Sequence, residues 1–298
     1  MKSKVFFSSE ITAEKVVELF HAAANDLPGG ILPGKVAVKL HSGEPGNQNF
    51  LKPEFWQPIV NDVHGTVVEC NTAYDGGRNT TEKHRETMEK HGWNKHFTVD
   101  IMDAEGPDAE LLIPNGKRIK KVPVGKNMLN YGSMLVLSHF KGHPMGGFGG
   151  AIKNISIGIA SSAGKAWIHS AGKTEDTEKL WSSLPAQDDF LESMAEAAKA
   201  IAAHCGERIL YISVMNNLSV DCDCDAHPEP PRMGDIGILA SLDPVALDQA
   251  CVDLVYASPD EGKVHLIERM ESRHGIHTLE HGEAIGLGSQ QYELVELE

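Results

Sequence analysis

Two cysteines separated by one residue, Cys222 and Cys224, and two histidines, His139 and His143, are the residues of this sequence best suited to bind a metal. Thiolate and imidazole are ligands that zinc and iron accept, and four of them complete a tetrahedral site. We therefore predict a metal site made of these four side chains, holding zinc, iron or a small iron–sulfur centre.

The acidic surroundings of the two cysteines leave other interpretations open. Asp221, Asp223 and Asp225 flank the thiols, and negative neighbours disfavour a thiolate, so without a bound cation the cysteines are expected to be poor nucleophiles. The same carboxylates can bind a hard cation through oxygen. The thiols can also be incidental residues of an exposed acidic loop.

A glycine-rich stretch follows His143. It contains Gly146, Gly147, Gly149 and Gly150 and leads to Lys153 and Asn154. Glycine amides can approach an anion without hindrance from a Cβ atom, so these six residues are predicted to hold a phosphate or a carboxylate. The spacing matches neither of the common nucleotide-binding glycine motifs. A tight strand-to-helix turn is the structural alternative.

Further histidines offer acid–base chemistry or a second metal motif. His41 and Glu44 form a candidate catalytic acid–base pair, and His169 follows the glycine-rich stretch and is expected to reach the same ligand or solvent. His277 and His281 fit the H-x-x-E-H pattern of some zinc proteases. Glycines at positions 282, 286 and 288 disfavour the helix that this pattern needs, so we do not predict proteolysis.

The elements that position these residues alternate between strands and helices. Short apolar runs at residues 36–40, 66–70, 134–137, 209–214 and 236–240 predict strands, and residues 12–24, 80–91, 188–204 and a segment beginning at Asp243 predict helices. This alternation is typical of an α/β fold with a largely parallel sheet flanked by helices. Loops that leave parallel strands share one edge of the sheet, so we expect the chemical groups on elaborated strand-end loops at that edge.

Composition limits the classes of partner. The chain has 27 Lys and Arg against 42 Asp and Glu, a net charge of −15, which repels nucleic acid. No apolar run approaches the ~20 residues of a membrane span, and no linker divides residues 1–298, so we expect one α/β domain. The lack of an export signal and the odd number of cysteines, five, predict a cytoplasmic protein with reduced thiols.

Several segments together carry a family resemblance. These segments are residues 39–47, 138–154, 162–165, 221–224 and 235–248. They resemble the family catalogued as domain of unknown function 362, whose members are often labelled uncharacterised iron–sulfur centre proteins. Many relatives carry an inserted ferredoxin-type run of four cysteines after the stretch that corresponds to residues 164–169. This chain has no cysteine between Cys70 and Cys205, so that run is missing.

Three functional hypotheses follow from the residues and the resemblance. The first is a cytoplasmic metal-binding protein, an enzyme or a redox accessory, with a His/Cys site at the carboxyl ends of the strands. The second is a metal-independent enzyme that binds a small anionic ligand at the glycine-rich stretch. The third is a docking partner of an electron-transfer protein.

Overall fold

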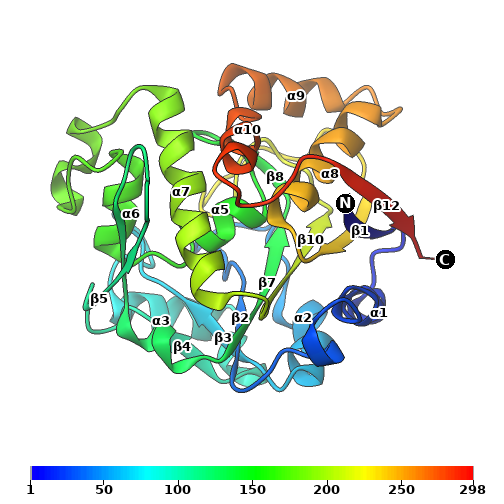
Figure 1. Cartoon of the computed structure of the whole chain (residues 1–298), viewed down its shortest axis with the longest axis horizontal. Helices are drawn as coiled ribbons and strands as arrows, with labels where there is room; N and C mark the ends of the chain where they lie inside the picture. The colour runs from blue at the N-terminus through cyan, green and yellow to red at the C-terminus, as the bar shows by residue number, and fades with distance from the viewer. Residues whose placement is uncertain (1, 298) are drawn as a thin grey trace.

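A mixed eight-stranded sheet forms the centre of the computed structural model, which describes residues 2–297 (Figure 1). Its order is β12-β1-β11-β10-β7-β2-β3-β4. The strands are β1 (Ser3–Ser8), β2 (Val36–Lys39), β3 (Thr66–Glu69), β4 (Val99–Ile101), β7 (Ser133–His139), β10 (Ile209–Met215), β11 (Gly237–Ser241) and β12 (Tyr292–Glu296). Two hairpins lie outside it: β5 (Ala109–Leu112) with β6 (Lys121–Val124), and β8 (Lys141–His143) with β9 (Gly147–Gly149).

Five adjacent strands, β10, β7, β2, β3 and β4, are mutually parallel. Every residue of β2, β3, β7 and β10 is buried, which explains why they read as continuous apolar runs instead of alternating patterns. The predicted parallel arrangement is therefore confirmed for this part of the sheet. β11 differs, because it pairs antiparallel with both β10 and β1.

Helices cover both faces of the sheet, as the α/β prediction requires (Figure 1). One face packs against α1 (Ala13–Ala24), α2 (Pro53–Asp62), α3 (Thr81–Lys90) and α4 (Trp93–His96). The other packs against α5 (Ala151–Ser156), α6 (Ser162–His169), α7 (Gln187–Cys205), α8 (Pro244–Ala257), α9 (Lys263–Ser272) and α10 (His277–Ala284). Short 3₁₀ turns are Pro28–Gly30, Lys126–Asn130 and Thr177–Ser182. No helix among residues 2–297 is both long enough and apolar enough to cross a bilayer.

Three of the predicted helices, α1, α3 and α8, begin at a residue whose side chain caps them, whereas α7 has no side-chain cap. Thr12 and Thr80 each accept a hydrogen bond from a backbone N–H in the first turn of α1 and α3. Asp243 caps α8 through the N–H groups of Val245 and Ala246, with Pro244 as the first helical residue. Local capping chemistry therefore sets these boundaries, as the sequence predicts.

The H-x-x-E-H motif forms a contact between helices. His277 and His281 lie on α10, and their Nε2 atoms are each 3.3 Å from a carboxylate oxygen of α7, on Glu192 and Glu196 respectively. Arg118 also pairs with Glu192. The two imidazoles therefore contact carboxylates that tie α10 to α7. The segment is helical although it contains Gly282, and the helix ends at Ala284, before Gly286.

The start of α5 is held by a buried carboxylate from another helix. Asp248 of α8 accepts hydrogen bonds from the N–H groups of Ala151 and Ile152, at 2.7 and 3.0 Å. A Cβ atom on Gly150 would lie 2.2 Å from an Asp248 oxygen, so glycine is needed for this approach. Burial raises the pKa of Asp248 to about 7. This contact fixes the helix that carries Lys153.

We predict that Asp248→Ala lowers the free energy of unfolding by ~2 kcal/mol, because two buried N–H groups lose their acceptor. Denaturant unfolding followed by circular dichroism measures the change. Asp75→Ala, at an exposed loop aspartate, serves as the control and is expected to change stability little. Equal stability of the two variants would contradict the assigned role of Asp248.

Candidate functional site

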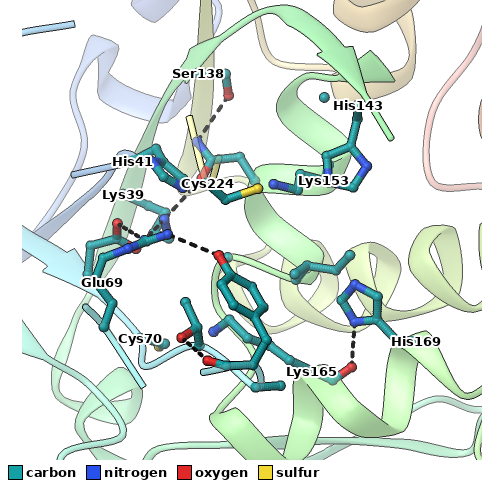
Figure 2. A pocket seen from close by; sticks show the side chains of 18 of the residues that line it. Lys39, His41, Glu69, Cys70, Ser138, His143, Lys153, Lys165, His169 and Cys224 are labelled. Atoms are coloured by element: carbon teal, nitrogen blue, oxygen red, sulfur yellow. Dashed lines mark hydrogen bonds and ion pairs between the residues drawn. The ribbon is translucent and has the colours of Figure 1, made fainter. Parts of the chain in front are cut away.

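A pocket opens at the carboxyl ends of β2, β3 and β7 (Figure 2). Its wall brings together residues that are remote in the sequence. The sequence-predicted residues that line it are His41, His139, His143, Gly149, Gly150, Lys153, Asn154 and Cys224. Glu44, Gly146, Gly147 and Cys222 are not part of this lining. The predicted common edge thus gathers eight of the twelve candidate residues around one cavity.

His139 is held by two acceptors. Its Nδ1 atom lies 3.0 Å from an oxygen of Asp223, and its Nε2 atom lies 2.6 Å from the carbonyl oxygen of Asn216. Both ring nitrogens are therefore engaged by oxygen atoms, and neither is directed at a metal in this arrangement. The structure therefore does not place a metal-donor atom of His139 beside those of the other three predicted ligands.

The remaining three predicted ligands do lie together. Nitrogen and sulfur donor atoms of His143, Cys222 and Cys224 are within 4.8 Å of one another. Cys222 and Cys224 are joined in a disulfide, with Cα atoms 5.3 Å apart, a separation that a disulfide readily spans. The prediction of reduced thiols is therefore wrong for this pair. Cys70, Cys205 and Cys251 are free and buried.

His143 presents a hydrogen-bond donor to the pocket. Its Nδ1 atom accepts hydrogen bonds from the N–H groups of Gly146, at 2.9 Å, and Met145, at 3.2 Å. Because Nδ1 is an acceptor, the neutral ring carries its hydrogen on Nε2. Burial, with the nearby Lys153, lowers the pKa of His143 well below its usual value. The ring is therefore neutral at pH 7 and able to donate from Nε2.

His169 has the opposite arrangement. Its Nδ1 atom lies 2.7 Å from the carbonyl oxygen of Lys165, so Nδ1 donates and Nε2 keeps a lone pair. The ring stacks on Phe190, with centroids 5.1 Å apart. Burial lowers the pKa of His169 to about 4, so this ring is also neutral at pH 7. The pocket lining thus includes an imidazole donor, His143, and an imidazole acceptor, His169.

Most of the cations around the pocket are matched by buried carboxylates. Lys39 lies 2.9 Å from Glu69, and Lys141 pairs with Asp223. Burial alone raises the pKa of Asp223, but His139 and Lys141 hold it well below its usual range. These pairs keep the charges ionised away from water.

Lys153 differs from these cations, because it has no carboxylate partner among residues 2–297. Its burial, with Lys141 and Lys39 as neighbours, lowers its pKa to about 7. Lys165 also lines the pocket and donates to the carbonyl oxygen of Ala160 at 2.6 Å. The pocket is therefore cationic in a protein that is acidic overall, and Lys153 is the lysine left to meet a ligand.

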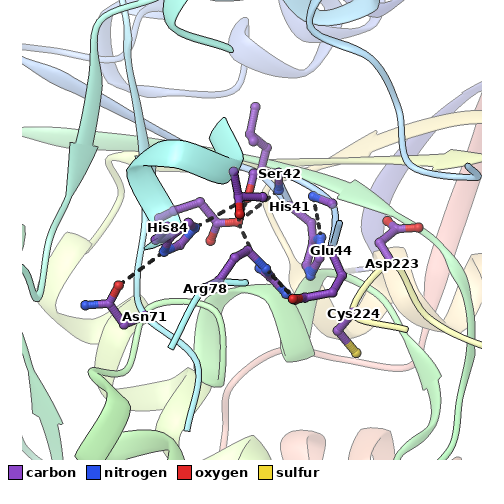
Figure 3. A network of polar contacts seen from close by, with 12 residues as sticks. His41, Ser42, Glu44, Asn71, Arg78, His84, Asp223 and Cys224 are labelled. Carbon is purple, nitrogen blue, oxygen red and sulfur yellow. Dashed lines mark hydrogen bonds and ion pairs between the residues drawn. The ribbon is translucent and has the colours of Figure 1, made fainter. Parts of the chain in front are cut away.

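The predicted acid–base pair is not joined in the structure. Glu44 accepts hydrogen bonds from Arg78 Nε and from the N–H of Gly77, both at 2.8 Å (Figure 3). His41 Nδ1 accepts from the N–H of Gly43 at 3.1 Å, so its Nε2 carries a hydrogen. Glu44 thus positions Arg78, while His41 faces the pocket by itself.

The glycine-rich stretch builds backbone turns more than an anion cradle. Gly147 adopts φ 80° and begins β9 of the small hairpin, and the first amides of α5 are occupied by Asp248. Asn154 donates to the carbonyl oxygen of Leu137 and accepts from Lys39 at 3.1 Å. A backbone turn therefore accounts for Gly147 and the approach of Asp248 for Gly150, and Lys153 is a group of this stretch that remains available.

Sequence reasoning missed several residues of the pocket and its supports. They are Lys39, Glu69, Arg78, Lys141, and Asp223 in its role as an ion-pair partner. Lys39 and Glu69 each occupy the last position of a buried apolar strand. Burying a charged side chain costs free energy unless the charge is paired. A charged residue within an apolar run, such as Lys39 or Glu69, therefore indicates a buried ion pair.

Fold and site together define an α/β protein with a cationic, histidine-lined pocket at the carboxyl edge of a mainly parallel sheet. Within this class, the chain belongs to the family described as Domain of unknown function (DUF362), whose model matches residues 36–253. A comparison with curated proteins found no match.

Two solved structures are similar in fold. The lactate racemase apoprotein from Thermoanaerobacterium thermosaccharolyticum shares 16% identity with a TM-score of 0.41, covering 72% of this chain and 51% of that one. A protein from Thermotoga maritima shares 12% identity with a TM-score of 0.48, covering 84% and 60% respectively. The chain thus spans about half to three fifths of these longer chains, and the similarity concerns the fold alone.

The charge of Lys153 gives a testable pH dependence. Because its pKa is about 7, the amine is protonated below this pH and loses its charge above it. We predict that sulfate, whose own charge is constant between pH 6 and 9, binds more weakly as the pH rises through 7. Lys153→Gln is expected to lower the affinity about tenfold or more, the effect of losing one charged hydrogen bond.

Isothermal titration calorimetry at several pH values measures this effect. Lys153→Arg keeps its charge over the whole range, so its affinity is expected to vary less between pH 6 and 9. Lys90→Gln, at an exposed position on α3, is the control. A wild-type affinity for sulfate that stays constant from pH 6 to 9 would contradict the assigned role of Lys153.

Proposed function

We propose that this protein is an enzyme that moves a proton to or from a small carboxylate or phosphate held in the cationic pocket. One observation carries the proposal: His143 and His169 line the same pocket in opposite tautomers, one with a hydrogen on Nε2 and one with a lone pair there. A proton donor and a proton acceptor are thereby available together without a change of pH.

The two tautomers are set by the backbone. Gly146 donates to His143, and the carbonyl oxygen of Lys165 accepts from His169, so neither ring needs a carboxylate to fix its orientation. Burial lowers the pKa of both rings, which keeps them neutral at pH 7. A bound anion favours the imidazolium form and raises both pKa values toward neutrality, where proton transfer is most effective.

The lysines of the pocket bind the substrate and stabilise its negative charge. Lys153 is available to bind the anionic group of a substrate, because no carboxylate among the described residues competes for it. Lys141 and Lys39 line the same cavity and add positive potential although each is paired. Fixed positive charge in a site shielded from water stabilises negative charge that develops on a substrate during proton transfer.

Hydrogen exchange tests this proposal directly. Small carboxylic acids and phosphate esters are incubated with the protein in D₂O, and loss of carbon-bound hydrogen is followed by NMR. We expect exchange in at least one anionic compound, with His143→Gln and His169→Gln each slowing it by about 10²- to 10⁴-fold. His204→Gln, exposed on α7, is the control. Exchange unchanged in the double histidine variant would contradict the proposal.

A metal site is the second candidate, because the donors of His143, Cys222 and Cys224 lie within 4.8 Å of one another. Such a site requires reduction of the disulfide. It also requires a lone pair from His143, whose Nδ1 is occupied by the N–H of Gly146. The anion-binding proposal needs neither change, and for this reason we rank it first.

Elemental analysis of protein purified under reducing conditions without chelator separates the two candidates. The metal hypothesis predicts about one zinc or iron per chain, lost in Cys222→Ser/Cys224→Ser. Equal metal content in the wild type and the double variant removes these cysteines as ligands. The sulfate affinity of both proteins, measured in parallel, reports whether the variant keeps its fold and its pocket.

A further inference from the structure

The two sulfur atoms of the Cys222–Cys224 disulfide differ in their access to the pocket. Cys224 is half-buried and lines the cavity, whereas Cys222 is 1% exposed and lies behind it. Figure 2 shows the sulfur of Cys224 and the amine of Lys153 directed into the same space. A nucleophile that enters the pocket therefore meets Cys224 first.

The aspartates around the cysteines do not act on the sulfurs as their sequence positions predict. Asp223 is paired with His139 and Lys141, and Asp221 lies 3.2 Å from Arg269. Asp225 is exposed and accepts a hydrogen bond from the N–H of His227. Two of the three negative charges are thus matched by cations.

The sulfur of Cys224 faces a wall that carries positive charge instead. Lys153 and Lys141 line the same pocket as Cys224. Positive neighbours stabilise thiolates, both those of an entering molecule and those released from a disulfide. From these surroundings we expect Cys224 to be more reactive than its acidic neighbours in the sequence predict.

We infer that Cys222 and Cys224 form a redox-active pair that exchanges with the thiol or disulfide of a small anionic molecule bound in the pocket. This inference rests on the proposed anion site and names the class of molecule it takes: a low-molecular-weight thiol that carries a carboxylate or sulfonate. The pocket supplies both the attraction for the anionic group and the accessible sulfur.

The exchange proceeds in two steps. The thiolate of the first small molecule attacks Cys224 Sγ, which forms a mixed disulfide and releases Cys222 as a thiolate. A second small thiolate attacks the small-molecule sulfur of the mixed disulfide, which releases Cys224 as a thiolate and a small-molecule disulfide. The protein gains two electrons, the two small thiols lose two, and their protons end on the protein thiols or in solvent.

The surroundings of Cys222 suit a leaving group. Its sulfur accepts a hydrogen bond from the N–H of Cys224 at 3.4 Å, and a ring nitrogen of His143 is within 4.8 Å. A leaving thiolate that is stabilised departs faster.

The test compares two thiols that differ in charge, 2-mercaptoethanesulfonate and 2-mercaptoethanol. Reduction of the folded wild-type protein is followed by alkylation and mass spectrometry, with rates expressed per thiolate present. We expect the anionic thiol to react about tenfold faster or more, because a cationic cleft raises the local concentration of anions. Lys153→Gln is expected to reduce this preference several-fold, whereas Lys90→Gln keeps it.

Single cysteine variants identify the attacked sulfur. Cys222→Ser is expected to form a mixed disulfide at Cys224 with the disulfide of 2-mercaptoethanesulfonate, seen as an added mass on the folded protein. Cys224→Ser is expected to form at least tenfold less, because Cys222 is buried. No preference for the anionic thiol, or equal labelling of the two variants, would overturn the inference.

Sulfate binding separates failure of this inference from failure of the proposed function. If Cys222→Ser/Cys224→Ser and the wild type bind sulfate equally while no charge preference appears, the redox inference alone is overturned. If the wild type does not bind sulfate, the anion site on which both rest is overturned as well. A stoichiometric metal on the reduced cysteines that blocks reoxidation by the small disulfide also overturns the redox inference.

Discussion

A charge buried in a protein must be matched by an opposite charge or by hydrogen bonds, and this constraint shapes the whole pocket. Asp223 illustrates it, because one carboxylate holds His139 at the end of β7 and Lys141 in β8. Its carbonyl oxygen also accepts from the N–H of Glu44, so the loop after β2 and the cysteine loop are joined at the same residue. Glu69 at the end of β3 has a similar role, because its carboxylate accepts hydrogen bonds from Lys39 Nζ and from the N–H of Ser42.

Because the other buried charges of the pocket are matched, Lys153 is the charged group available to a ligand. Lys153 lies on α5, and the position of α5 depends on Asp248 and on the absence of a side chain at Gly150. The same short stretch of chain supplies the N–H groups that fix the tautomer of His143. The glycines therefore matter less as an anion cradle than as the backbone that orients a lysine and a histidine.

The sequence was sufficient to predict the architecture because its local signals agree with the fold. Buried parallel strands read as apolar runs, and capping residues such as Asp243 mark where helices begin. Loop positions after parallel strands then predicted which residues meet. β11 could not be assigned a direction in this way, because an apolar run has the same pattern whether it pairs parallel or antiparallel.

The hydrogen-bond and ion-pair partners of individual side chains could not be predicted from the sequence, for a different reason. His139 was expected to face the same ligand as His143, yet the carbonyl oxygen of Asn216 and the carboxylate of Asp223 occupy its two nitrogens. The aspartates are adjacent to the cysteines in sequence, but their side chains point to other partners, Asp223 to His139 and Lys141 and Asp221 to Arg269. The order of the sheet carries one more consequence: β1, the first strand of the chain, pairs with β11 and β12 near its end. During synthesis on the ribosome β1 therefore has no partner strand until β11, which begins at Gly237, has been made.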